Sequence, residues 1–143
     1  MIENRFSEIE AKSWRASAGS DAADQELAER VYTSRLIGFD RDLLMHGGGN
    51  TSVKLQRKNL FGEQKDVLHV KGSGWDLDTI QAAGLPGVWL DALLKLRQLN
   101  ALSDEDMVNF QRANLLDCVS PNPSVETLLH AFLPHRYVDH THA

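Results

Sequence analysis

Two histidines near the end of the chain, His140 and His142, are separated by a single residue. In a β-strand, side chains two residues apart point to the same face, so the two imidazoles would converge on one point. Paired imidazoles are natural ligands for a divalent transition metal, and zinc needs at least a third protein ligand. His130 and His135 are further candidates on spacing alone, whereas Asp139 would point to the opposite face. A half-exposed strand that carries two histidines by chance is the alternative.

A glycine-rich segment, Gly-Gly-Gly-Asn-Thr-Ser at 47–52, has the composition of an anion-binding loop. Glycine lets the backbone approach a ligand closely, successive N–H groups can surround an anion, and amide and hydroxyl side chains add donors. The segment is not a Walker loop, because no Gly-Lys-Ser/Thr follows, and not a Rossmann fingerprint, because the glycines precede a strand. A flexible loop before a hairpin is the alternative.

A second glycine-rich segment, Lys-Gly-Ser-Gly at 71–74, closes a predicted hairpin. Alternating and β-branched residues predict strands over 51–56 and 66–70, joined by a polar connection at 57–65. If these strands pair antiparallel, the two glycine-rich segments meet at one end of the sheet. Their convergence favours a phosphate cradle, and a plain turn is the alternative. The neighbouring Trp75 is expected in the core.

A carboxylate, Glu126, follows a helix-start signal. Asn122 suits the cap of a helix and Pro123 its first turn, so Glu126 falls in that turn. The helix dipole stabilises a carboxylate there, which is a purely structural role. A general base beside a metal is the functional interpretation.

The remaining pattern predicts an α/β chain without repeats or low-complexity tracts. Residues 1–20 lack clear periodicity, and Ser-Ala-Gly-Ser at 17–20 is typical of a flexible joint, so 1–20 is predicted to be an N-terminal extension. Helices are predicted at 21–38, 88–99, 104–116 and 124–132, and a last strand at 137–142.

Length and composition narrow the classes of protein that fit. The 143 residues (16.0 kDa) suit one domain, and 42% hydrophobic with 24% charged residues allows a packed core. A net charge of −5 argues against a nucleic-acid binder and a basic membrane-surface module. No apolar run approaches the roughly 20 residues that span a bilayer, and the charged N-terminus is not a secretory signal. The single Cys118 fits a reducing compartment, so we expect a cytoplasmic protein.

Taken together, four motifs resemble the class II aldolase/adducin family. They are GGGNTS at 47–52, KGSG at 71–74, PSVE at 123–126 and HTHA at 140–143, and their order matches that family from about residue 25 to the end. The surrounding sequence is most similar to the aldolase part of the bifunctional rhamnulose-1-phosphate aldolase/short-chain dehydrogenase proteins.

The resemblance implies a three-layer α/β/α fold with a mainly antiparallel central sheet. Residues 21–143 would be the N-terminal portion of that domain, incomplete at its C-terminus. It also implies a divalent metal, usually zinc, bound by His140, His142 and a third histidine beyond Ala143. Because the chain stops directly after the histidine pair, we expect it to be a truncated piece that is inactive alone and tends to self-associate.

The resemblance also assigns roles to individual residues. Glu126 takes the place of the catalytic acid/base, and Val125 stands where relatives often have a second serine. The residues expected to hold substrate phosphate are Gly49, Asn50, Ser73, Gly74 and Ser124.

The activity implied is retro-aldol cleavage of a ketose 1-phosphate, such as rhamnulose 1-phosphate, to dihydroxyacetone phosphate and an aldehyde. Cleavage leaves negative charge on an enediolate, which a cation held by neutral imidazoles stabilises as a Lewis acid. Glu126 would move the proton at the adjacent carbon. A sugar-phosphate epimerase and a non-catalytic, adducin-like association module are the alternatives. The expected partners are a small sugar phosphate and further copies of the chain in a homo-oligomer, not nucleic acid or a membrane.

Overall fold

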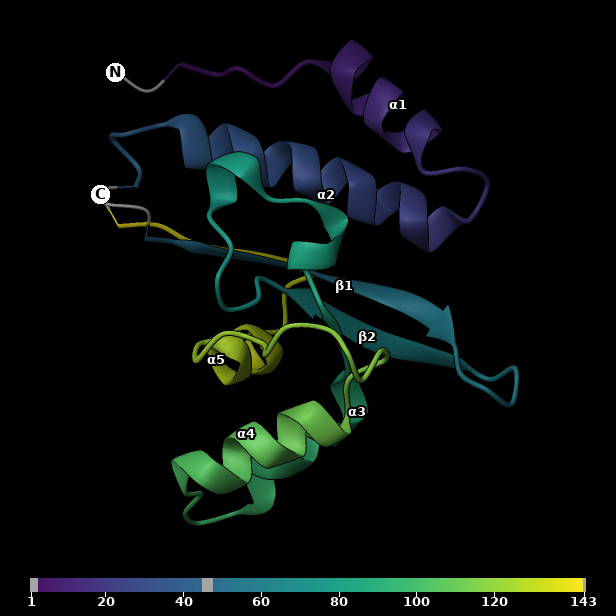
Figure 1. Ribbon diagram of the computed structural model, residues 1–143, viewed down its shortest axis with the longest axis vertical. Helices are drawn as coiled ribbons and strands as arrows, with labels where there is room; N and C mark the ends of the chain where they lie inside the picture. Colours follow the sequence, from purple (N-terminus) through teal and green to yellow (C-terminus); the bar gives the residue numbers. More distant parts are fainter. Residues whose placement is uncertain (1–2, 45–47, 143) are drawn as a thin grey trace.

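A computed structural model of the chain describes residues 3–44 and 48–142. Figure 1 shows a central sheet with α1 and α2 on one side and α3, α4 and α5 on the other. The elements are α1 (Glu8–Ser17), α2 (Ala22–Phe39), β1 (Asn50–Lys58), β2 (Gln64–Val70), β3 (Gly87–Trp89), α3 (Leu90–Lys95), α4 (Asp104–Ala113), α5 (Thr127–Phe132) and β4 (Tyr137–His140). Short 3₁₀ turns lie at Leu77–Thr79, Ala82–Gly84 and Leu96–Gln98.

The sheet has the strand order β3-β2-β1-β4, and every neighbouring pair is antiparallel. Ser52 of β1 lies opposite Val70 of β2 on one side and Val138 of β4 on the other. The predicted hairpin is confirmed, although both strands are longer than 51–56 and 66–70. The connection is correspondingly shorter, because Asn59 closes a tight turn: its side-chain oxygen accepts from the backbone N–H groups of Phe61 and Glu63.

Each face of the sheet has its own apolar core, because side chains alternate along the strands. On the α2 face, Val53 of β1 belongs to the same cluster as Val31 of α2. On the other face, Leu68 of β2 packs in a cluster with Val88 and Leu93. These residues are 0–2% exposed, so the hairpin is the shared wall between the two cores.

Arg30 of α2 is a buried cation that joins the helix to the sheet. It is 4% exposed. Its guanidinium donates to the backbone oxygens of Ser52 and Val138, both at 3.0 Å, and pairs with the carboxylate of Asp139. A buried charge is tolerated only when it is paired and hydrogen-bonded, so these contacts fix β1 and β4 relative to α2.

The N-terminal region contains a helix, α1, that the sequence analysis did not anticipate. Ser7 caps it by accepting a hydrogen bond from the backbone N–H of Glu10. The ring of Trp14 stacks on Tyr32 of α2, with 6.3 Å between centroids. Of the helix residues only Ala11 is buried, so the apolar stripe that reveals a helix in the sequence is nearly absent. The proposed division of the chain at residue 20 stays a prediction.

The predicted helix at 88–99 was wrong at its start. Val88 pairs with Leu68 as part of β3, and the helix begins only at Leu90. The predicted helix at 104–116 ends at Ala113, because Leu115 leaves it to form a bridge with Val88. In both places, backbone pairing at the β3 edge of the sheet holds residues whose spacing in the sequence is typical of a helix.

Two elements near the C-terminus are shorter than predicted. The helix expected over 124–132 begins at Thr127, because Ser124 uses its hydroxyl oxygen to accept from the N–H of Glu126 in a preceding turn. The strand expected over 137–142 ends at His140, and His142 forms a separate bridge with Leu44.

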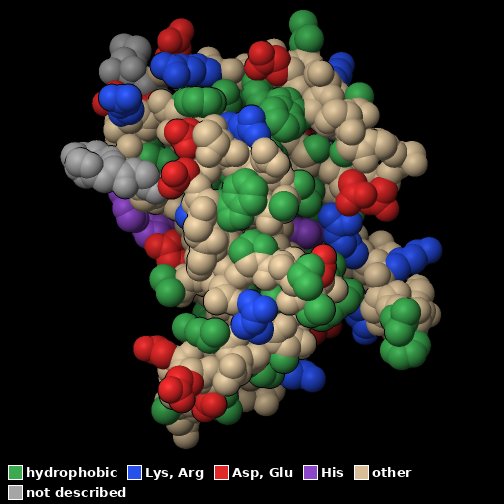
Figure 2. All heavy atoms as spheres, in the orientation of Figure 1, with side chains coloured by type: hydrophobic (Ala, Val, Ile, Leu, Met, Phe, Trp, Pro, Cys, Tyr) green, Lys and Arg blue, Asp and Glu red, His purple; other side chains and the backbone are tan. Residues whose placement is uncertain are grey.

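Exposed large apolar side chains occur on several elements of the described residues. Figure 2 shows apolar side chains in separate groups, one of them on the projecting β1–β2 hairpin. At the turn of that hairpin, Leu60 is 94% and Phe61 82% exposed. Within residues 3–44 and 48–142, every helix is too short or too polar to cross a lipid bilayer.

His69 of β2 is buried, and both nitrogens of its imidazole ring lie within hydrogen-bond distance of a partner. Its Nδ1 lies 2.7 Å from the carbonyl oxygen of Leu85, and its Nε2 accepts from Nε of Arg57 at 3.0 Å. The proton therefore sits on Nδ1. Burial, with a smaller contribution from the charge of Arg57, lowers the pKa of His69 from 6.5 to about 4.

We therefore predict that His69 makes the free energy of unfolding depend on pH. The unfolded chain binds a proton at this residue below about pH 6.5, whereas the folded chain does so only near pH 4. Between these values, stability should fall as the pH falls, by at most about 1.4 kcal/mol per pH unit from this histidine. Urea unfolding at pH 7.5 and pH 5 should show a smaller pH dependence for His69→Gln than for the wild type. Equal pH dependence in both proteins contradicts the prediction.

Candidate metal and phosphate site

Three side chains that can bind a metal converge where α5 and β4 approach each other. Glu126, His140 and His142 each offer a ligand atom, and these atoms all lie within 4.8 Å of one another. Nδ1 of His140 is 2.7 Å from Oε1 of Glu126. The two imidazole rings meet edge to face with 4.7 Å between centroids. The predicted convergence of the histidine pair is thus present, with a carboxylate as the third member.

The two histidines are brought together by different contacts. His140 is the last residue of β4 and lies opposite Asn50 of β1. His142 follows the end of the strand, and its backbone N–H donates to the carbonyl oxygen of Leu43 at 2.8 Å. The segment after α2 therefore sets the position of the second imidazole.

Gly48 leaves the space that His142 occupies. A Cβ atom at Gly48 would lie 2.4 Å from Nδ1 of His142, closer than side chains approach one another. Gly49, next in the loop, has φ +92°, a conformation that favours glycine. The other glycine of the predicted loop, Gly47, and Ala143 lie outside the described residues.

The donor set fits a divalent cation. Two imidazole nitrogens and one carboxylate oxygen are the three protein ligands of a common type of catalytic zinc site. Among the described residues, Nδ1 of His140 is buried without a hydrogen-bond partner, and its 2.7 Å contact with Oε1 of Glu126 lacks hydrogen-bond geometry. Buried polar atoms without partners are rare in native proteins, and a cation would satisfy such atoms. His142 is exposed, so the site opens to solvent.

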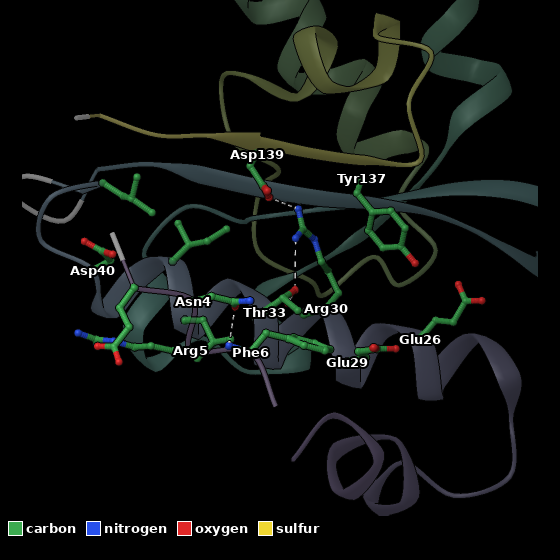
Figure 3. A pocket seen from close by; sticks show the side chains of 14 residues that line it. Asn4, Arg5, Phe6, Glu26, Glu29, Arg30, Thr33, Asp40, Tyr137 and Asp139 are labelled. Carbon is green, nitrogen blue, oxygen red and sulfur yellow. Dashed lines mark hydrogen bonds and ion pairs between the residues drawn. The ribbon is translucent and has the colours of Figure 1, made fainter. Parts of the chain in front are cut away.

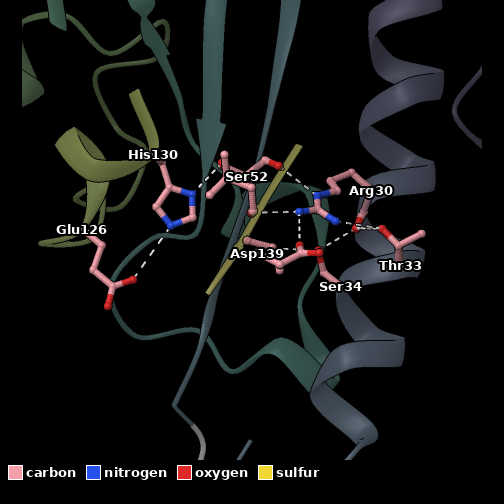
Figure 4. Close-up of polar contacts among 9 residues, drawn as sticks. Arg30, Thr33, Ser34, Ser52, Glu126, His130 and Asp139 are labelled. Carbon is pink, nitrogen blue, oxygen red and sulfur yellow. Dashed lines mark hydrogen bonds and ion pairs between the residues drawn. The ribbon is translucent and has the colours of Figure 1, made fainter. Parts of the chain in front are cut away.

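His130, named above as a ligand candidate on spacing, lies beside the cluster rather than in it. It is fully buried, with Nδ1 2.6 Å from Oγ of Ser52 and Nε2 3.9 Å from Oε2 of Glu126 (Figure 4). Burial lowers the pKa of His130 to about 4, opposed by the charge of Glu126 and assisted by that of Lys54. The imidazole is neutral at pH 7. The other candidate, His135, is exposed, and its carbonyl oxygen accepts from Lys54.

Asn50 and Ser124, two of the predicted phosphate ligands, touch each other beside the cluster. Nδ2 of Asn50 donates to Oγ of Ser124 at 2.5 Å, and the N–H of Glu126 donates to the same oxygen at 3.2 Å. Because Oγ accepts twice, the hydroxyl proton of Ser124 is free to donate to a ligand. Oδ1 of Asn50 is buried and has no partner among the described residues.

The second glycine-rich segment is fastened to the same region. Gly72 forms a bridge with Pro123, and the N–H of Ser124 donates to the carbonyl oxygen of Lys71 at 3.1 Å. The backbone N–H of Ser73 donates to the carbonyl oxygen of Asn122 at 2.8 Å, and Ser73 is exposed. Gly74 follows with φ +87° and is exposed. The two segments therefore meet as the hairpin pattern predicted, and the phosphate roles of these residues stay predictions.

A groove lined by α2, β4 and the N-terminal segment is separate from this cluster. It has a volume of about 500 Å³ (Figure 3). Arg30, Tyr137 and Asp139 line it, because alternate residues of β4 face away from His140. The Arg30 guanidinium is already bonded to backbone oxygens and to Asp139, so this buried cation is not available to a ligand in the groove.

Comparison with known proteins agrees with this geometry. Residues 28–143 match the family model described as the Class II Aldolase and Adducin N-terminal domain. The chain belongs to the class II aldolase and adducin family. This assignment confirms the family-level resemblance drawn from the four motifs.

Two known proteins are similar to this chain, one by sequence and one by structure. The chain is 47% identical over 114 residues to the protein named uncharacterized oxidoreductase YuxG of Bacillus subtilis (strain 168), a match that spans 80% of this chain and 16% of YuxG. The solved N-terminal class II aldolase domain of a conserved protein from Thermoplasma acidophilum has 40% identity and a TM-score of 0.83. That match covers all of this chain and 61% of the other, and it confirms the mainly antiparallel α/β/α fold.

Sequence reasoning named the members of the candidate site, but it did not predict the contacts that surround them. Nothing in the sequence pointed to Ser52 as the partner of His130 across the sheet. A usable signal was present for Glu126 and His130, because residues four apart on a helix lie on the same face.

Because Gly48 borders His142 so closely, we predict that Gly48→Ala weakens metal binding. The added methyl group must displace the imidazole, and we expect the dissociation constant for zinc to rise about 10-fold or more, as when a ligand's supporting contacts are lost. A zinc titration against a competing chelator dye measures the change. In a His142→Ala background the same substitution should have little further effect. A full additional loss in that background, or unchanged affinity in Gly48→Ala, contradicts the prediction.

Proposed function

We propose that this domain is the metal-dependent aldolase part of an enzyme that cleaves a ketose 1-phosphate, such as rhamnulose 1-phosphate, to dihydroxyacetone phosphate and an aldehyde. The observation that carries the proposal is the convergence of Glu126, His140 and His142 next to the Asn50–Ser124 pair. A metal site and a candidate phosphate site side by side suit a substrate that has an oxygen to polarise and a phosphate to hold.

In this proposal His140 and His142 hold zinc or another divalent cation. When bound, the cation supplies a Lewis acid that stabilises negative charge developing on a substrate oxygen. Neutral imidazole ligands leave the full charge of the cation available for this purpose.

Glu126 is proposed as the acid/base of the reaction. Its carboxylate lies between the imidazole of His140 and that of His130, with Oε2 buried. A carboxylate held in this position can accept a proton from the substrate and return one to the carbon next to the carbonyl group. General acid–base catalysis of this kind contributes typically about 10²–10⁴-fold in rate.

The glycine-rich segments are proposed to bind the substrate phosphate. The free hydroxyl proton of Ser124, the amide of Asn50 and the hydroxyl of Ser73 are the donors available, with Gly49 and Gly74 providing backbone that a phosphate can approach closely. Binding a remote phosphate orients the reacting carbons near Glu126, which lowers the entropic part of the barrier.

The alternatives differ in what they require of this cluster. A sugar-phosphate epimerase would use nearly the same residues, whereas an adducin-like association module has no use for Glu126 between two imidazoles. The convergence of these donors therefore favours an enzyme.

We also propose a fusion partner, an oligomeric state and a cellular location for the domain. The word oxidoreductase in the name of YuxG, of which this chain spans 16%, supports fusion to a short-chain dehydrogenase in a longer protein. We further propose a homo-oligomer and a cytoplasmic location.

Metal binding tests the enzyme against the association module. We predict that the chain binds one equivalent of zinc, and that His140→Ala raises the dissociation constant about 100-fold, because a ligand is lost. The exposed His135 provides a matched control, since His135→Ala should leave zinc affinity unchanged. Absence of zinc binding at saturating metal in the full protein that contains this domain supports the association module.

Substrate cleavage tests the role of Glu126. We predict that Glu126→Gln lowers kcat for rhamnulose 1-phosphate cleavage about 10²–10⁴-fold in the full protein that contains this domain. Release of dihydroxyacetone phosphate, followed with a coupled dehydrogenase, measures the rate, and the 143-residue chain assayed in parallel tests whether it is inactive alone. The variant and the wild type are assayed at saturating zinc, because Glu126 is also one of the three donors of the metal cluster. Unchanged kcat excludes Glu126 as the acid/base, and interconversion of epimers without cleavage supports the epimerase.

A further inference from the structure

We propose that His130 is a positioning residue for Glu126: Ser52 fixes the imidazole through Nδ1, and Nε2–H holds Oε2 of the carboxylate so that Oε1 faces His140. The inference rests on the proposed function, because it assigns His130 a role toward the same carboxylate. It adds a residue to the site that does not bind the metal or the substrate itself.

The Nδ1 side of His130 is anchored to the rigid centre of the sheet. Oγ of Ser52 lies 2.6 Å from Nδ1, and both residues are fully buried. Ser52 lies in the inner strand β1, between Val70 of β2 and Val138 of β4, and its carbonyl oxygen accepts from Arg30. The contact from Arg30 through Ser52 to His130 is continuous across the sheet (Figure 4). An imidazole held in this way has little freedom to rotate.

The Nε2 side of His130 faces Glu126 and has no other partner among the described residues. Nε2 lies 3.9 Å from Oε2 of Glu126, one helical turn earlier in the chain. Both atoms are buried and lack a hydrogen bond. An orphaned buried donor beside an orphaned buried acceptor is costly, and a small rotation of the carboxylate joins the two.

The tautomer of His130 follows from these contacts. A carboxylate accepts but does not donate, so an unprotonated Nε2 would place two lone pairs against each other. The hydroxyl of Ser52 can rotate to donate to Nδ1. The favourable arrangement is therefore Ser52 Oγ–H to Nδ1 and Nε2–H to Glu126.

This arrangement divides the two oxygens of Glu126 between different neighbours. Oε2 belongs to His130, and Oε1 lies 2.7 Å from Nδ1 of His140. The plane of the carboxylate is thereby fixed before a metal or substrate arrives. Removing a residue that orients a metal ligand without binding the metal itself commonly weakens metal affinity about 10–100-fold.

The tautomer can be tested without any metal. In the metal-free chain with ¹⁵N-labelled histidine, the NMR spectrum should show His130 protonated at Nε2 and not at Nδ1 at pH 7. Ser52→Ala should shift the Nδ1 resonance, and Glu126→Gln should shift that of Nε2–H. A proton on Nδ1, or an Nε2 resonance that Glu126→Gln leaves unchanged, overturns the proposal.

A pair of substitutions separates the two nitrogens of the ring. His130→Gln can place an amide N–H where Nε2 was, whereas His130→Asn keeps only the group near Ser52. We expect cobalt(II), followed by its visible absorption spectrum, to bind His130→Gln within about 3-fold of the wild type and His130→Asn about 10-fold more weakly. His69→Asn, in another buried histidine whose ring contacts Arg57 and Leu85 and no member of the site, is the matched control for loss of stability, measured by urea unfolding.

The outcomes distinguish the two proposals. Equal cobalt affinity in His130→Asn and His130→Gln, or a loss in His69→Asn as large as that in His130→Asn, reduces His130 to a structural core residue. If the wild type binds no cobalt, the proposed aldolase function fails, while the NMR result still decides whether His130 holds Glu126.

Discussion

The pairing of β4 with β1 is the interaction on which the candidate site depends. It places His140 opposite Asn50, so one candidate metal ligand and one candidate phosphate ligand face each other across a single pair of strands. Because β4 lies at the edge of the sheet, β1 is its only partner strand among those described. Arg30 reinforces that pairing from the opposite face by bonding to the backbone of both strands and to Asp139.

Buried polar groups are unusually concentrated along this junction. Arg30, Ser52 and His130 are each at most 4% exposed, and each contacts the next through the central strand. Such groups are stable only when their hydrogen bonds are satisfied, so they specify one arrangement of helix, sheet and loop. The network ends at Glu126, whose buried Oε2 has no hydrogen-bond partner among the described residues. Apart from Nε2 of Gln111, the buried side-chain polar atoms without partners among the described residues all belong to this site, so ligand binding is most expected here.

Family membership and local geometry support different parts of the functional argument. Membership in the class II aldolase and adducin family establishes the fold, but that family also includes proteins that are not enzymes. The distances among Glu126, His140 and His142 carry the proposal of a metal-dependent enzyme, because three metal-binding side chains offer ligand atoms within 4.8 Å of one another. The metal, the sugar and the neighbouring domain remain part of the proposal.

By itself, the sequence determined the hairpin, α2 and the members of the candidate site, because glycine segments, alternation and a His-x-His pattern are local signals. It did not reveal α1, whose exposed surface lacks an apolar stripe, nor β3, where pairing with Leu68 overrode the helical spacing around Val88. Only the tertiary structure decided that His142 packs against Gly48 and that His130 joins Ser52 to Glu126. The physical reason is that strand pairing and burial bring together residues far apart in the chain, and no local pattern encodes such contacts.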